Sequence, residues 1–167
     1  LLSKYSNAGI PVFLATIASN HRHHRPFNSI PTSDAAKTQL AQASTPKALA
    51  NVASQLVSNQ SADLHFALAQ QLLNQGQIDL AKKHFALAKE YDLLRFRAPD
   101  AINDVILGFA GTEKVFITDV NDRMQQRSEA GIIGNNLMLE HLHPNVQGYF
   151  LLADTFYQSL LKSQIFT

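Results

Sequence analysis

The sequence predicts an α/β fold with parallel strands, and three observations support this class. Two short apolar runs, residues 10–17 and 114–120, are rich in the β-branched and aromatic residues typical of buried parallel strands. The segments between and after them carry apolar residues at helical spacing. The order of strand, helices, strand and helix is that of a parallel sheet with right-handed crossovers. We therefore predict part of a three-layer α/β/α sandwich with an unusually long helical crossover.

Length, charge and composition narrow the possible functions. The 167 residues correspond to about one domain, and the net charge of +1 provides no field that would recruit nucleic acid or an anionic membrane. No apolar run approaches the roughly 18 residues of a spanning helix, so we expect a soluble chain with no membrane span. The lack of cysteine excludes disulfides and thiolate chemistry. It leaves the compartment open, either cytoplasmic or periplasmic.

The beginning of the chain reads as the continuation of a longer protein. It opens LLSKYSNAGIPV, without an initiator Met, a basic n-region or a cleavage site. We expect residues 1–8 to end a helix that Gly9 terminates, and a segment upstream to continue the sheet. The polar and proline-containing stretch that follows the first strand, residues 18–33, is predicted to be a loop.

The middle of the chain is predicted to be helical. Residues 34–59 suit two short helices, with Pro46 in the first turn of the second after Ser44 or Thr45. Residues 61–92 form the clearest helical pair, and their apolar and small residues fall at the offsets of a tetratricopeptide repeat (TPR). A single repeat needs neighbours to pack against, so we expect it to contact the preceding helices or the domain body. The residues at these offsets are Leu68, Leu72, Gly76, Ala81, Phe85 and Ala88.

The last third of the chain is predicted to return to the α/β part. Pro99 suits a helix start, and residues 121–136 suit a polar helix or loop. Residues 146–161 predict a closing amphipathic helix. We thus expect an α/β part made of residues 1–33 and 99–167, interrupted by a helical insertion over residues 34–98. The expected apolar face of the helix after Pro99 is Ile102, Val105, Ile106 and Phe109, and that of the closing helix is Phe150, Leu151, Ala153, Phe156, Tyr157 and Leu160.

The candidate catalytic residues lie in LEHLHPNVQGY, residues 139–149. In proteins with parallel sheets, functional residues usually lie outside the carboxyl ends of the strands. Both this segment and the loop with Asn20 can reach that edge of the sheet. A carboxylate three residues before a histidine, as Glu140 is before His143, can orient and charge-stabilise the ring. The pair would then be half of a catalytic relay, although a polar helix cap without chemistry would also explain it. We expect His141 to point away from Glu140.

Two further clusters have alternative interpretations. The histidines of HRHHR, residues 21–25, suit a solvated loop, but with His141, His143 and Glu140 they could instead converge on a Zn²⁺ ion. Neither histidine cluster has the H-E-x-x-H spacing of a helical zinc site, and we predict no metal. Arg97, near Arg95, could bind a substrate carboxylate or phosphate, or could form an ion pair with Asp92 or Asp100.

Several segments together resemble the C-terminal half of an SGNH (GDSL-type) hydrolase. They are GIPVFLAT followed by NHR and PF, then AKEYDLLRFRAP, VFITDV and NNLMLEHLHPNVQGYFLLAD, and they cover nearly all of residues 9–161. The most specific is the last, where the family has an acid, two residues, a histidine, often Pro, and a Gly ahead of a helix. These positions are Glu140, His143, Pro144 and Gly148 here.

The resemblance implies a serine esterase or acyl hydrolase with a flavodoxin-like sandwich and a TPR-like insertion. His143 would be the general base and Glu140 its orienting acid, where the family usually has Asp. Asn20 and Arg97 would be candidates for binding a small-molecule or glycan ester, and the reaction needs no cofactor. The acyl acceptor is either water or another hydroxyl, so the enzyme is either a hydrolase or an O-acyltransferase.

The main departure of this sequence from the family pattern is the absence of the nucleophile. No Gly-Asp-Ser block occurs in these 167 residues, and Asn20 follows the strand that the family's oxyanion Asn precedes. We therefore expect the nucleophilic Ser in the upstream N-terminal part of the same protein, and this chain alone to be inactive. The competing hypothesis is a non-catalytic interaction module, in which the TPR-like helices bind a protein partner. A Gly-Asp-Ser motif upstream would favour the enzyme.

Overall fold

The computed structural model describes residues 1–165 of the chain. Within it the chain divides into two compact units, which we call the α/β unit (residues 1–20, 98–129 and from 133 onward) and the helical unit (residues 21–97 and 130–132). About 53% of the chain is helical. The loop of residues 21–33 therefore lies with the helices, whereas the sequence had suggested that it belongs to the α/β part.

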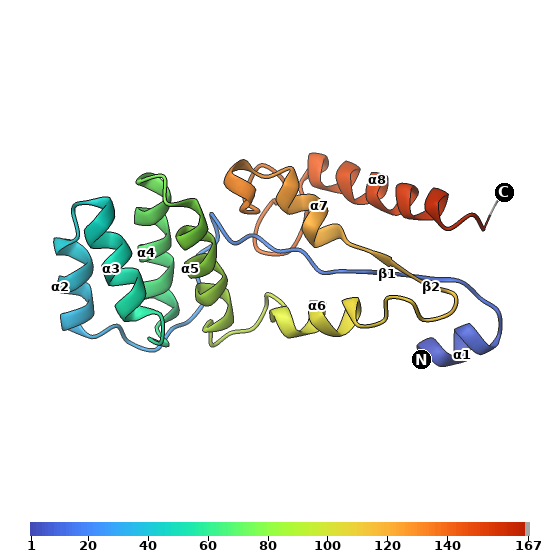
Figure 1. Ribbon diagram of the computed structural model, residues 1–167, viewed down its shortest axis with the longest axis horizontal. Helices are drawn as coiled ribbons and strands as arrows, with labels where there is room; N and C mark the ends of the chain where they lie inside the picture. Colours follow the sequence, from blue (N-terminus) through green and yellow to red (C-terminus); the bar gives the residue numbers. More distant parts are fainter. Residues whose placement is uncertain (166–167) are drawn as a thin grey trace. The chain divides into compact units, whose positions relative to one another are not determined.

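Two parallel strands form the sheet of the α/β unit. Strands β1 (Val12–Ala15) and β2 (Val115–Thr118) pair in register from Val12↔Val115 to Ala15↔Thr118. The rings of Phe13 and Phe116 stack across this pair, with centroids 5.0 Å apart. The predicted α/β class with parallel strands is therefore confirmed. Figure 1 shows the two strands side by side, although they are about a hundred residues apart in sequence.

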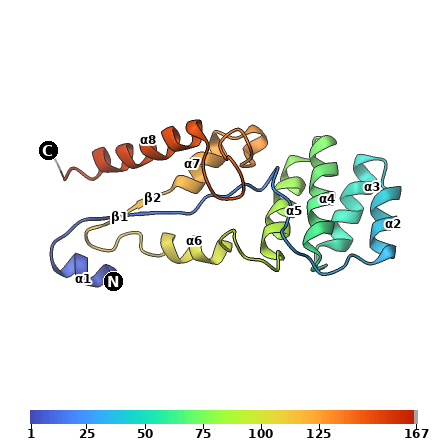
Figure 2. The same ribbon diagram turned by 180° about the vertical axis from the view of Figure 1, so that it is seen from behind.

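Four helices accompany this sheet. Helix α1 (Leu2–Asn7) precedes β1 and ends before Gly9, whose φ of +73° is a left-handed conformation that glycine adopts without strain. Helix α6 (Asp100–Leu107) precedes β2, while α7 (Val120–Gln126) and α8 (Val146–Lys162) follow it, with a short 3₁₀ turn, η1 (Glu129–Gly131), between them. Figures 1 and 2 show α8 on one side of the strands and α6 on the other.

The buried core of the α/β unit lies between β1, α7, the loop after α7, and α8. On α8 the residues that pack against this core are Leu151, Leu152 and Phe156. Phe150 and Tyr157, which were expected to face inward, are 74% and 56% exposed, and Ala153 is exposed as well, so that prediction is wrong for these three side chains. Apolar residues occur all around α8, and periodicity alone therefore cannot select its buried face. The core consists of Val120, Met124, Ile133, Leu137 and Met138.

Helix α6 is also more exposed than its sequence suggests. None of its residues is buried, and Ile102 and Val105 of the predicted apolar face are among the exposed hydrophobic side chains. The amide of Asn103 instead bonds the backbone N–H and C=O of Ile17, at 2.7 and 2.9 Å. A polar contact thus ties α6 to the residues that follow β1.

The helical unit contains four helices, three of which begin at side-chain caps. They are α2 (Asp34–Gln42), α3 (Pro46–Leu56), α4 (Ala62–Asn74) and α5 (Ile78–Glu90). Thr45 caps α3 and Pro46 occupies its first turn, as expected, while Ser33 and Ser61 cap α2 and α4 through their hydroxyl oxygens. Figure 1 shows these helices stacked side by side in chain order.

The core of the helical unit contains the apolar positions identified from the sequence. Gly76, with φ of +70°, lies in the tight turn between α4 and α5. Small residues let two helices approach closely, and α4 and α5 make the most extensive helix–helix contact among the described residues. All five apolar residues of the predicted pattern are at most 1% exposed: Leu68, Leu72, Ala81, Phe85 and Ala88. Among the described residues, no helix is both long and apolar enough to cross a membrane.

Candidate active site

The segment that carries Glu140 and His143 is a short closed loop ahead of α8. The backbone N–H of Leu139 donates to the carbonyl of His143 at 2.8 Å, and Asn145 N–H donates to Leu137 O at 2.9 Å. Asn145 then caps α8, because its side-chain oxygen accepts from the backbone N–H of Gly148 at 3.0 Å. These bonds hold the loop at the N-terminal end of a 17-residue helix.

Gly148 lets this loop pack against the first turn of α8. A Cβ at this position would clash with the carbonyl oxygen of Leu137 and would lie 2.8 Å from Cβ of Pro144. Only a residue without a side chain fits this close approach of two backbones. The Gly that follows the histidine in the sequence pattern thus has a direct steric role in positioning the loop.

Glu140 binds His143 through both the backbone and the ring. Its Oε1 atom accepts from Nδ1 of His143 at 2.5 Å, from the backbone N–H of His143 at 2.6 Å and from that of Leu142 at 3.2 Å. A carboxylate only accepts, so the His143 ring carries its proton on Nδ1 and has a bare Nε2 when neutral. This is the tautomer that a general base needs.

The electrostatics of Glu140 favour its charged form. Partial burial acts to raise the pKa of the carboxyl group, but hydrogen bonds from His143, Leu142 and His141 outweigh this effect and lower the pKa to about 2. Glu140 is therefore ionised at neutral pH and can stabilise an imidazolium at His143. The His143 side chain is 68% exposed, so its ring is open to a reacting group.

His141 also contacts Glu140, contrary to the sequence-based expectation. Its Nδ1 atom lies against Oε2 of the carboxylate, while His143 occupies Oε1. The expectation assumed that positions 140 and 143 of the turn lie on one side and that position 141 points elsewhere. In this loop the glutamate side chain is long enough to lie between the two rings, so each imidazole meets one carboxylate oxygen.

Asn20 supports this loop from the end of β1. Its backbone N–H donates to the carbonyl of His141 at 3.0 Å, and its side-chain amide donates to Oδ1 of Asn135 at 2.8 Å. The prediction that the loop after β1 reaches the Glu140 segment is confirmed for this residue. Asn20 is only 1% exposed, so the geometry favours a scaffolding role over substrate binding.

Arg97 lies in the helical unit as part of a buried ion pair. Its guanidinium donates to Oδ2 of Asp92 at 3.1 Å and to the carbonyl of His24 at 3.1 Å. Burial lowers the pKa of Arg97, and the hydrogen bond and charge of Asp92 oppose this effect. Asp92 also accepts from the backbone N–H groups of Phe27 and Asn28. This network explains Arg97 structurally and supplies no reason to place it at a substrate.

The histidines of residues 21–25 belong to the helical unit, and Glu140, His141 and His143 to the α/β unit. Within the part of the chain that the structure describes, no group of three or more His, Cys, Asp or Glu residues is arranged to hold a metal ion.

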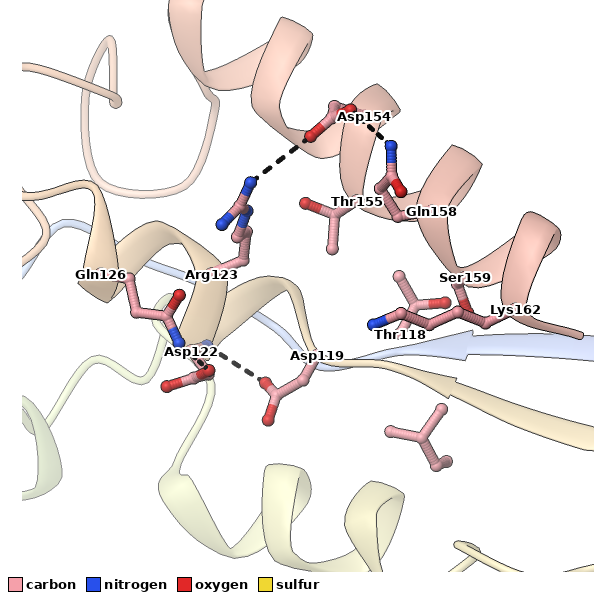
Figure 3. Close-up of a pocket in the computed structure, with 11 residues that line it drawn as sticks. Thr118, Asp119, Asp122, Arg123, Gln126, Asp154, Thr155, Gln158, Ser159 and Lys162 are labelled. Carbon is pink, nitrogen blue, oxygen red and sulfur yellow. Dashed lines mark hydrogen bonds and ion pairs between the residues drawn. The ribbon is translucent and has the colours of Figure 1, made fainter.

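A second polar site, missed by the sequence analysis, lies between β2, α7 and α8. It is a pocket of about 510 Å³ at the carboxyl end of β2, and Figure 3 shows its polar side chains. Arg123 and Asp154 face each other across it at 3.6 Å. Thr118 is 1% exposed, and its hydroxyl has no hydrogen-bond partner in the described structure. Asp119, directly after β2, was the one sequence signal for this pocket, and it had been included in the predicted strand of residues 114–120.

Comparison of the chain with protein-family models, curated proteins and solved structures finds no match. The assignment of a function therefore rests on the sequence resemblance and on the geometry of the Glu140 loop.

Proposed function

We propose that this chain supplies the base and the acid of a serine ester hydrolase or O-acyltransferase of the SGNH type. The observation that carries the proposal is the bond between Glu140 Oε1 and His143 Nδ1, which leaves Nε2 of an exposed ring free. The loop that holds this pair begins α8 and is bonded to the residues at the carboxyl end of β1. That is the edge at which α/β proteins bind their ligands.

In the proposed reaction, Nε2 of His143 removes the proton of a serine hydroxyl as its oxygen attacks the ester carbonyl. Glu140 holds the ring in the correct tautomer and stabilises the imidazolium that forms. The imidazolium then protonates the departing alcohol, which leaves an acyl-serine. Water or a second hydroxyl, activated by the same Nε2, releases the acyl group. The serine and the oxyanion donors belong to the upstream part of the same protein, the fold is the family's sandwich, and no cofactor takes part.

The test uses the longest natural chain that contains these residues and p-nitrophenyl acetate as substrate. His143→Ala should lower kcat about 10³-fold or more, and Glu140→Gln about 10- to 10³-fold, because the ring remains but loses its charge partner. Glu113→Gln, an exposed acid elsewhere in the α/β unit, is the matched control and should leave turnover unchanged. Full activity of His143→Ala would refute the proposal.

A second candidate function is a protein-interaction module, and a groove in the helical unit favours it. The groove has a volume of about 490 Å³, and its lining includes the apolar side chains of Ile30, Leu40 and Leu64. An extended peptide with apolar side chains would suit this lining. A longer natural chain that lacks both esterase activity and a Gly-Asp-Ser motif, and that binds a peptide through this groove, would favour the module.

A further inference from the structure

The carboxylate of Glu140 is held at both of its oxygens, and each is held by a different histidine. Oε1 accepts from the ring of His143 and from two backbone N–H groups, as described above. Oε2 is in contact with Nδ1 of His141. Because a carboxylate cannot donate, both rings carry their Nδ1 proton and both have a bare Nε2 when neutral.

The two histidines differ in how they are placed. The His141 side chain is 22% exposed, against 68% for His143. The backbone of His141 is also fixed, because its carbonyl accepts from Asn20, which is buried and bonded to Asn135. His143 is thus the ring that is open to a reacting group, and His141 is the more enclosed one.

We propose that His141 is a positioning residue, which holds the Glu140 carboxylate in place for His143. The catalytic role of His141 in this inference rests on the proposed function. The contact between His141 and Glu140 does not depend on that function. Glutamate has one more rotatable bond than the aspartate usual in the SGNH family. An unrestrained carboxylate would therefore be poorly oriented toward His143 and would lose more side-chain entropy when it binds the ring. A donor at the second oxygen removes this freedom. His141 supplies that donor two residues before the base.

Substitutions of His141 can separate the donor from the ring. Asparagine places an amide N–H close to the position of Nδ1, so His141→Asn should keep the bond to Oε2. Phenylalanine keeps the ring volume but has no donor, so His141→Phe should remove the bond. If His141 only filled space, His141→Phe should resemble the wild type more than His141→Asn does. If His141 positions Glu140, His141→Asn should resemble the wild type more than His141→Phe does.

The first measurement uses residues 1–167 without any substrate. The pKa of Glu140 is followed by the NMR shift of its side-chain carboxyl carbon between pH 1.5 and 6, for as long as the amide spectrum shows a folded chain. His141→Phe should raise this pKa measurably, because a donor to the charged form is lost, and His141→Asn should leave it near the wild-type value. An equal pKa in wild type and His141→Phe would overturn the inference.

The second measurement uses the longer, active protein. His141→Phe should lower kcat about 10-fold with little change in KM, because a misplaced acid affects the reaction more than substrate binding, and His141→Asn should restore most of the loss. If His141→Phe kept full activity, the positioning role would be wrong. If His141→Phe were inactive and His143→Ala active, His141 would be the base. A longer protein without esterase activity would refute the proposed function, while the NMR result would still decide the contact between His141 and Glu140.

Discussion

Two neighbouring threonines at the ends of β1 and β2 have opposite hydrogen-bonding states. Thr16 donates its hydroxyl to Asp119 Oδ1 at 2.8 Å and accepts from the backbone N–H of Asn121 at 2.9 Å. The hydroxyl of Thr118, on the adjacent strand, is buried with no partner in the described structure. A buried hydroxyl without a partner reduces stability, whereas one that links the end of β1 to the start of α7 increases it.

This contrast predicts opposite effects of the same substitution. Thr118→Val should raise the free energy of unfolding by about 1 kcal/mol, and Thr16→Val should lower it by about 1–3 kcal/mol. Urea denaturation followed by circular dichroism measures both values. Equal destabilisation by the two variants would mean that the Thr118 hydroxyl is bonded in solution, by a water or a ligand in the pocket of Figure 3.

A second residue-scale feature is the buried pair of His65 and His84 in the helical unit. Their Nδ1 atoms are 2.8 Å apart, and Nε2 of His65 is 2.7 Å from the carbonyl of Asn59. The carbonyl accepts, so His65 carries its proton on Nε2. Burial lowers the pKa of His65. It also lowers the pKa of His84 to about 4, with smaller contributions from the charges of His65 and Lys83.

The helical unit should therefore lose stability in mild acid. In the unfolded chain a histidine protonates near pH 6.5, whereas His84 stays neutral in the fold down to about pH 4. The stabilising effect of the neutral pair is complete above pH 6.5, and His84 alone should lower the stability progressively as the pH falls through this window. Denaturation at pH 7.5 and pH 5 measures it. His84→Gln should reduce the slope. A wild-type stability that is equal at both pH values would contradict the prediction.

At the scale of elements, the start of α3 and the buried face of the α4–α5 pair were predictable, whereas the buried faces of α6 and α8 were not. The cap of α3 at Thr45 and Pro46 is encoded by two adjacent residues, and the α4–α5 pair by small residues at fixed offsets. The buried face of α8 depends instead on which neighbours surround it, and Phe150 and Leu151 are equally apolar in sequence. Likewise, the contact between His141 and Glu140 depends on the path of the loop.

The loop before α8 provides the sharpest element-scale prediction. Gly148→Ala should destabilise the α/β unit by several kcal/mol, or displace the Glu140 loop, because the new Cβ would meet the carbonyl of Leu137 and neither backbone can move freely. Gly108→Ala is the matched control: its Cβ would be no closer than 3.3 Å to any atom. Thermal unfolding measures the loss of stability, and the NMR shifts of His143 report a displacement of the loop. A Gly148→Ala protein with unchanged stability and shifts would contradict the role of Gly148.

At the scale of the whole molecule, the α/β unit exposes surfaces that usually lie inside a larger sheet. Within residues 1–165 the sheet has two strands, so each strand has an edge that pairs with no other strand. Large apolar side chains are exposed on both flanking helices, such as Val105 on α6 and Phe150 on α8. Apolar surface of this kind is typical of a contact with further protein. This feature is compatible with the proposal that further protein completes the site.

The last prediction concerns the proposed division of the active site, in which residues 1–167 supply the base and another part of the protein supplies the nucleophile. Among the described residues no serine hydroxyl is bonded to His143, whose ring contacts Glu140. Purified residues 1–167 should therefore not hydrolyse p-nitrophenyl acetate above the rate of the buffer, whereas a natural chain extended upstream should. The shorter chain should also bind an apolar dye such as ANS more strongly, because its exposed side chains would be covered in the longer one. His143→Ala in the longer chain controls for a contaminating esterase. Turnover by residues 1–167 that disappears in their own His143→Ala variant would place the nucleophile within this chain and overturn the division.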